Sequence, residues 1–96
     1  MKIEFADKRL ALVLTDQAHK LGLPPAIIKS CREKLHAIAN ASTELTLRNL
    51  RSLDYKKLEG SEERQIRLND QYRMRFMLDT TTAPPTVIVT FIGDPH

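Results

Sequence analysis

The sequence predicts an α+β fold, in which two N-terminal helices pack on one face of a twisted antiparallel β-sheet. Two observations predict it. In the first half of the chain apolar residues recur every three or four positions, as on one face of a helix, whereas from Arg64 onward they alternate, as in strands. Helices and strands that are segregated along a chain in this way are typical of α+β domains. The length of 96 residues corresponds to one domain, residues 1–96.

The N-terminal half predicts a short strand and a helical hairpin. Met1–Phe5 alternates weakly and favours a strand. Asp7 is a suitable N-cap for a helix that runs to about His19, and Gly22 ends it. A second helix begins at Pro24-Pro25, since proline is tolerated in a first turn, and frays near residues 40–42. Its core-facing stripe is Ile27, Ile28, Cys31, Leu35 and Ile38.

Two segments in the middle of the chain leave alternatives open. Leu45, Leu47 and Leu50 fit either a helical turn or the start of a loop. Residues 54–60 fit either a strand or a loop that ends in a turn at Gly60.

The C-terminal half predicts a β-hairpin and a further strand. Arg64–Leu68 and Tyr72–Asp79 alternate around a turn at Asn69-Asp70, which gives a hairpin with one apolar and one basic face. After a turn at residues 80–85, Val87–Ile92 is apolar throughout. A continuous β-branched run predicts a central strand that is covered on both faces.

The charge distribution indicates a basic surface in the second half. The formal net charge is +3, and the basic residues between Arg48 and Arg75 outnumber the acidic ones. The basic residues are Arg48, Arg51, Lys56, Lys57, Arg64, Arg67, Arg73 and Arg75. Such a surface fits polyanion binding through phosphate contacts, and it also fits an ordinary solvated surface. The charges alone do not decide between these readings.

Composition also bears on the compartment. The single Cys31 cannot form an internal disulfide, which favours a reducing environment. No apolar run is long enough for a transmembrane helix, and Glu4 stands where a signal peptide would have its apolar stretch. We therefore expect a cytoplasmic protein with no membrane partner.

The hairpin places two arginines opposite each other. If the turn centres near Asp70, Arg67 and Arg73 lie on the same face of adjacent strands. Like charges in this position repel, and a bound polyanion would relieve the repulsion. Pairing of the arginines with nearby acids such as Asp70 or Asp94 explains the pattern equally well.

His96, the last residue of the sequence, is a candidate general acid or base, and Asp94 could orient it. RNA cleavage requires deprotonation of a 2′-hydroxyl, stabilisation of the phosphorane and protonation of the 5′-oxygen. One histidine, a carboxylate and two or three basic residues suffice for this chemistry, although a terminal histidine is also common in frayed ends. Cys31 lies on the helical stripe and favours a core position over a nucleophilic one. No His and Cys residues have metal-ligand spacing, and we expect no cofactor.

These residues resemble those of a known toxin family. The segment Arg64–Phe76, RQIRLNDQYRMRF, is similar to the SIRVN-x-x-(Y/W)-R-x-x-F hairpin of HigB-type toxins in the RelE/ParE-like superfamily. The end of the sequence, Phe91–His96, resembles the IVDYH tail of that family, and Leu58-Glu59-Gly60 resembles its LxG motif. The resemblance extends more loosely over nearly the whole chain.

The resemblance implies a RelE-like microbial ribonuclease fold and the toxin of a type II toxin–antitoxin system. Such toxins are metal-independent endoribonucleases that cleave mRNA in the ribosomal A site. A cognate antitoxin, often a helix-turn-helix protein, neutralises them and contacts operator DNA within the complex. By this likeness the catalytic residues are His96, Asp94, Arg73 and Arg67. The basic pattern and the likeness together suggest as substrate-binding residues Lys56, Lys57, Arg64, Arg75 and Tyr72.

The sequence departs from the family pattern at three places, one of which is the short turn from Gly60 to Arg64. The tyrosine of the family tail is Pro95 here, and the loop before the hairpin is short and lacks the family's histidine. Lys56, Lys57 or Tyr55 would have to take the place of that histidine. The alternative function is therefore a toxin-fold protein that does not cleave RNA, either a gyrase inhibitor or a module that binds only antitoxin or nucleic acid.

Overall fold

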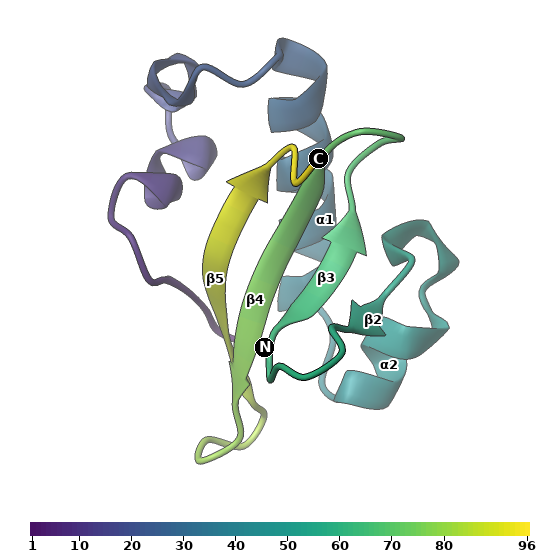
Figure 1. The fold of residues 1–96 in the computed structure, drawn as a ribbon. Helices are drawn as coiled ribbons and strands as arrows, with labels where there is room; N and C mark the ends of the chain where they lie inside the picture. Colours follow the sequence, from purple (N-terminus) through teal and green to yellow (C-terminus); the bar gives the residue numbers. More distant parts are fainter.

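A computed structural model describes the whole chain, Met1–His96, as a sheet covered on one face by a long helix (Figure 1). The helices are α1 (Pro25–Ala39) and α2 (Glu44–Asn49). The strands are β1 (Ile3–Phe5), β2 (Lys56–Lys57), β3 (Arg64–Arg67), β4 (Arg73–Asp79) and β5 (Thr86–Gly93). Three short 3₁₀ helices complete the fold: η1 (Leu10–Leu14), η2 (Ala18–Leu21) and η3 (Arg51–Leu53). None of the helices combines the length and apolar character needed to cross a membrane.

The five strands form one mixed sheet in the order β1-β5-β4-β3-β2. The α+β class is confirmed, but the expectation of a wholly antiparallel sheet is wrong at one edge. There β1 runs parallel to β5, with Ile3 opposite Val87.

The first predicted helix is replaced by the two short helices η1 and η2. Thr15 separates them with an extended backbone (φ −120°, ψ 172°). Its hydroxyl donates to the carbonyl of Leu12 (2.9 Å) and accepts from the N–H of Gln17 (3.1 Å). These bonds satisfy backbone groups without a continuous helix, which explains the break. Gly22 ends the segment as predicted, with φ 71°.

The second predicted helix is confirmed as α1. Of its predicted stripe, Ile27, Cys31, Leu35 and Ile38 are buried, whereas Ile28 is half-buried. The N-terminal ammonium group of Met1 donates to the carbonyl of Ala39 (2.9 Å), the last residue of this helix, and to that of Ala41 (2.6 Å), two residues beyond it. A cation at a helix C-terminus is favoured by the exposed carbonyls there.

Both segments for which the sequence left alternatives, residues 45–50 and 54–60, contain regular structure. Leu45 and Leu47 belong to α2, and Leu50 follows its last residue. This helix is capped by Thr43, whose hydroxyl accepts from the N–H of Thr46 (3.2 Å). Residues 54–60 contain the two-residue strand β2 and a turn at Gly60 with φ 71°.

A β-bulge determines which residues of β5 face the core. Arg75 lies opposite Phe91 and Phe76 lies opposite Val89, which leaves Thr90 as the extra residue. Val87, Val89 and Ile92 are consequently all buried, whereas Ile88 and Phe91 are half-buried on the sheet face opposite α1. We call this face the open face. The prediction that β5 is covered on both sides is therefore wrong.

Candidate functional site

The β3–β4 hairpin sets Arg67 directly opposite Arg73, as the sequence predicted. Arg67 forms an ion pair with Asp70 in the turn. Arg73 has no carboxylate partner; its Nη1 donates to the carbonyls of Asn69 (2.6 Å) and Tyr72 (3.0 Å). A nearby carboxylate thus neutralises the charge of Arg67, whereas the charge of Arg73 is balanced only by carbonyl dipoles.

The chain that follows β5 returns to this hairpin turn. Gln71 Nε2 donates to Asp94 Oδ2 at 2.7 Å. The other oxygen, Oδ1, bonds both the backbone N–H (2.9 Å) and the ring Nδ1 (2.7 Å) of His96. We call Arg67, Asp70, Gln71, Arg73, Asp94 and His96 the hairpin–tail cluster. Figure 1 shows the C-terminus beside β4, near the β3–β4 turn.

Asp94 orients the imidazole of His96. The Gln71 amide, followed by the backbone and ring N–H groups of His96, lowers the pKa of Asp94 to about 2. The carboxylate is therefore ionised near neutral pH and favours the tautomer in which Nδ1 carries the proton. The side chain of His96 is 65% exposed, and Nε2 has no partner within the chain, so it is free to exchange a proton with a bound molecule.

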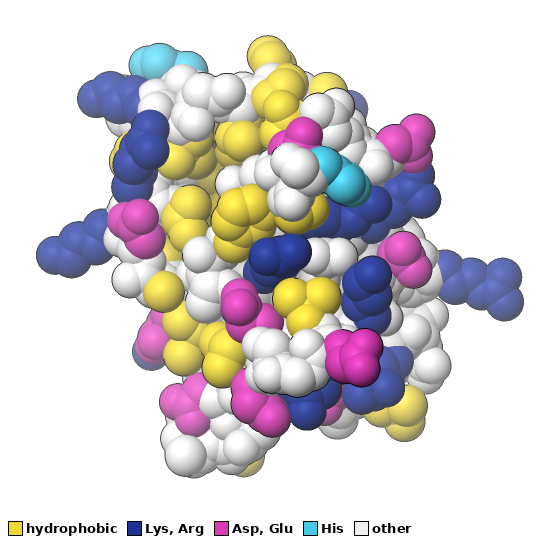
Figure 2. Space-filling view, viewed as in Figure 1, with side chains coloured by type: hydrophobic (Ala, Val, Ile, Leu, Met, Phe, Trp, Pro, Cys, Tyr) yellow, Lys and Arg dark blue, Asp and Glu magenta, His cyan; other side chains and the backbone are white.

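Arg75 lies on the open face, two residues along β4 from Arg73. Its Nε donates to Gln65 Oε1 (3.0 Å), and its guanidinium lies 5.3 Å from the centre of the Phe91 ring. Figure 2 shows basic and hydrophobic side chains side by side on this face, with a histidine near one end. Lys56 in β2 lies opposite Gln65 in β3 and is exposed at the edge of the sheet.

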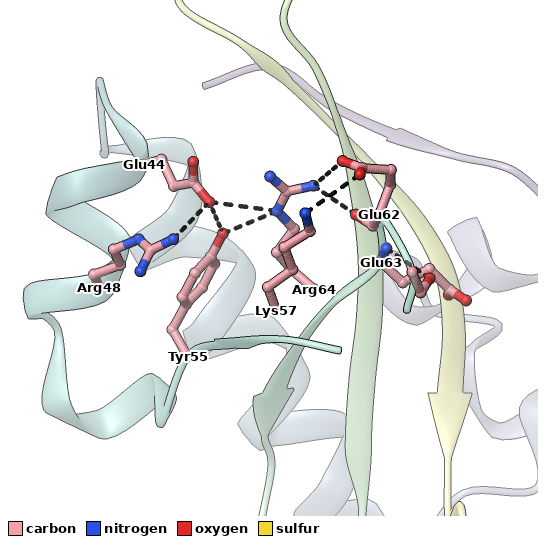
Figure 3. Close-up of polar contacts among 8 residues, drawn as sticks. Glu44, Arg48, Tyr55, Lys57, Glu62, Glu63 and Arg64 are labelled. Carbon is pink, nitrogen blue, oxygen red and sulfur yellow. Dashed lines mark hydrogen bonds and ion pairs between the residues drawn. The ribbon is translucent and has the colours of Figure 1, made fainter. Parts of the chain in front are cut away.

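The structure does not bring Arg64 together with the hairpin–tail cluster. Arg64 lies opposite Phe76, a core residue, and so it points to the helix-covered face. Its Nε donates to Glu44 Oε2 (3.3 Å) and to the Tyr55 hydroxyl (3.2 Å), which ties β3 to α2 (Figure 3). Only 12% of its side chain is exposed. This placement corrects the expectation that Arg64 is available to a substrate.

Lys57 and Tyr72 also lie away from the cluster's exposed groups. Lys57 pairs with Glu62 at 3.3 Å near the Arg64 contacts (Figure 3). Tyr72 is half-buried and packs against the core, because it shares the inward face of the hairpin with Met74. Of the predicted substrate-binding residues, Arg75 and Lys56 remain on the open face.

Cys31, His19 and His36 take no part in the cluster. Cys31 is fully buried, and burial raises the pKa of its thiol to about 12, in agreement with a core role. His19 and His36 are exposed on the helical layer. No three His, Cys, Asp or Glu side chains lie close enough together to hold a metal ion.

Three contributors were missed by the sequence reasoning. Gln71 binds Asp94 across 23 positions of sequence, and no local pattern signals such a contact. Gln65 and Phe91 flank Arg75, but Phe91 reaches the open face only because of the bulge at Thr90. The alternation of β3 could have identified Gln65, since it shares the face of Arg67.

Comparison with known proteins identifies the fold. No protein-family model matches the chain, and no curated protein matches its sequence. A solved structure described as a YoeB/ParE toxin from Agrobacterium tumefaciens is similar over 100% of both chains, with a TM-score of 0.58 and 10% sequence identity. At this identity the likeness shows that the two chains share a fold, and it does not single out a HigB branch.

Proposed function

We propose that this chain is the toxin of a type II toxin–antitoxin system and acts as a metal-independent endoribonuclease that cleaves mRNA on the ribosome and so inhibits translation. The observation that carries the proposal is the hairpin–tail cluster. In it a carboxylate-oriented imidazole, 2.7 Å from Asp94, lies beside a hairpin with two arginines opposite each other. The toxin-type fold supports the same assignment.

The cluster supplies the groups that cleavage of an RNA phosphodiester needs. The 2′-hydroxyl loses its proton, its oxygen attacks phosphorus, and the bond from phosphorus to the 5′-oxygen breaks as that oxygen gains a proton. Nε2 of His96 carries out one of the two proton transfers, solvent water carries out the other, and Asp94 stabilises the imidazolium. The products are a 2′,3′-cyclic phosphate and a 5′-hydroxyl.

Arg73 and Arg67 stabilise the charge that develops on the phosphorane oxygens. Arg73 is free of carboxylates and needs only to exchange carbonyl contacts for a phosphate. The partner of Arg67 is Asp70, whose side chain is 93% exposed. Exposed ion pairs contribute only about 0–1 kcal/mol, so a phosphate can displace this carboxylate at little cost.

The proposed partners follow from the toxin role. They are the ribosome with its mRNA and a cognate antitoxin with a helix-turn-helix domain, which would contact operator DNA in the complex. The site of action would be the cytoplasm.

The test is induced expression of untagged wild type, His96→Ala and His36→Ala in cells, followed by primer extension on a reporter mRNA. His36→Ala is the matched control, because His36 is also exposed but lies on α1. We expect growth arrest with new mRNA 5′-ends from wild type and His36→Ala, and neither from His96→Ala.

Other outcomes would point to the alternatives. Growth arrest with intact mRNA would replace the ribonuclease proposal with a gyrase inhibitor. Absence of both arrest and cleavage from folded protein would leave a module that binds antitoxin or nucleic acid only.

A further inference from the structure

A row of four side chains crosses the open face next to the hairpin–tail cluster. Lys56 lies opposite Gln65, Gln65 opposite Arg75, and Arg75 opposite Phe91. The neighbouring row along the strands consists of Arg67, Arg73 and Gly93. Two residues of strand separate the rows by about 7 Å.

Arg75 is held in the row without a counter-ion. Gln65, which is only 7% exposed, accepts a hydrogen bond from Arg75 Nε. The Phe91 ring lies against the guanidinium of Arg75. Arg48, Arg64 and Arg67 behave differently, since each pairs with a carboxylate, whereas Arg73 in the neighbouring row shares the lack of a carboxylate partner. The guanidinium of Arg75 is thus held in place by Gln65 and Phe91, and no carboxylate neutralises its charge.

Gly93 allows the Phe91 ring to lie towards the cluster. A Cβ at position 93 would stand 3.1 Å from Cζ of Phe91, closer than side chains ordinarily approach. The ring therefore extends over Gly93, which lies opposite Arg73. The bulge that turns Phe91 outward is anchored by Thr90, whose hydroxyl donates to Glu63 Oε2 (2.7 Å).

We propose that Arg75 and Phe91 form a stacking platform for one nucleobase of single-stranded RNA, next to the scissile phosphate at Arg73. The inference rests on the proposed function and adds a base-binding subsite to it. Flat aromatic rings and arginine guanidinium planes are the surfaces on which proteins stack unpaired bases. The two rows are neighbours on one face, about 7 Å apart, and the charge of Arg75 favours the polyanion.

The test combines base removal with side-chain replacement. Ribosomes programmed with a short synthetic mRNA are cleaved by wild-type protein, and the cleaved bond is mapped. Two further mRNAs carry an abasic nucleotide, one on each side of that bond. Single-turnover cleavage rates at subsaturating protein are then compared for wild type, Phe91→Leu, Phe91→Tyr and Phe5→Leu. Phe5→Leu is the matched control, because Phe5 packs on the helix-covered face of the sheet.

We expect one of the two abasic mRNAs to be cleaved about 5- to 150-fold more slowly by wild type, the range for loss of one stacked base. Phe91→Leu should cleave the intact mRNA more slowly by a similar factor and be nearly insensitive to removal of that base. Phe91→Tyr and Phe5→Leu should keep the wild-type sensitivity.

The two proposals fail in different ways. If Phe91→Leu shows the same sensitivity to base removal as wild type, or if wild type shows none, the platform is refuted while the ribonuclease assignment stands. If folded wild-type protein cleaves no programmed mRNA, the ribonuclease assignment fails and the platform fails with it.

Discussion

Replacing Arg64 with glutamine should weaken the fold without impairing RNA cleavage. Arg64 connects β3 to α2 through Glu44 and Tyr55 and lies on the face opposite to the hairpin–tail cluster. Arg64→Gln removes the charge and shortens the side chain, so both contacts are lost.

The expected cost is about 2 kcal/mol. Hydrogen bonds to charged groups contribute about 1.5–3 kcal/mol each when they are shielded, and the two bonds of Nε share a single donor. Nη1 also contacts the Glu62 carboxylate (3.6 Å) and donates to the Glu62 carbonyl (2.5 Å). Both contacts are exposed to solvent and add little. Burial, followed by the bond to Glu44, raises the pKa of Tyr55 to about 12, so its hydroxyl stays protonated in both proteins.

Urea unfolding measures the loss. With a slope of about 1 kcal/mol per molar urea, the midpoint should fall by about 2 M at unchanged slope. Arg48→Gln is the matched control, because Arg48 also pairs with Glu44 (3.6 Å) but is 56% exposed. Its unfolding free energy should change by less than about 0.5 kcal/mol.

Cleavage by folded Arg64→Gln should match wild type at a temperature well below its transition. A variant of wild-type stability with lost cleavage would place Arg64 at the RNA and refute this reasoning. Equal destabilisation by Arg64→Gln and Arg48→Gln would show that burial of the contact does not matter.

Three further predictions concern the tail, the platform and the thiol. Gln71→Ala should raise the pKa of Asp94 from about 2 towards its ordinary range, as followed by carboxyl NMR titration. Because folding lowers that pKa, the ionised Asp94 with its bonds to Gln71 and His96 stabilises the fold fully above the ordinary aspartate range, and this stabilisation is lost as the pH falls through about 2. An unchanged pKa of Asp94 in the variant would exclude Gln71 as the main cause of the shift. Gly93→Ala should displace the Phe91 ring and slow cleavage several-fold, while the unfolding free energy changes by less than about 1 kcal/mol; unaltered cleavage would count against the platform. Cys31 should resist a thiol reagent at pH 8 until urea unfolds the chain, and rapid native reaction would contradict its burial.

Local sequence patterns sufficed for several parts of the fold. The helix α1 follows from a stripe of apolar residues and a proline start, and the opposition of Arg67 to Arg73 follows from alternation around one turn. The contact of Asp94 with His96 joins residues two apart, and it too could be anticipated.

Non-local contacts set the limits of prediction. The parallel pairing of β1 with β5 joins segments more than eighty residues apart, such as Ile3 and Val87, and no short-range pattern encodes it. The bulge at Thr90 depends on the register of β4 and β5, so the outward position of Phe91 could not be read from an apolar run. The position of Arg64 on the helix-covered face could have been predicted from the sequence, because alternation puts Arg64 on the same face as the buried Ile66.

The position of β5 has a consequence for biosynthesis. This strand comes last along the chain yet lies between β1 and β4 in the sheet. A ribosome that is still making residues 86–93 therefore carries a nascent chain whose first strand has no partner and whose β4 exposes an unpaired edge. Such long-range pairing closes slowly compared with local structure. The sheet should therefore form only after Thr86–Gly93 have left the ribosome, and messages that end before Thr86 should yield unfolded products that are subject to proteolysis.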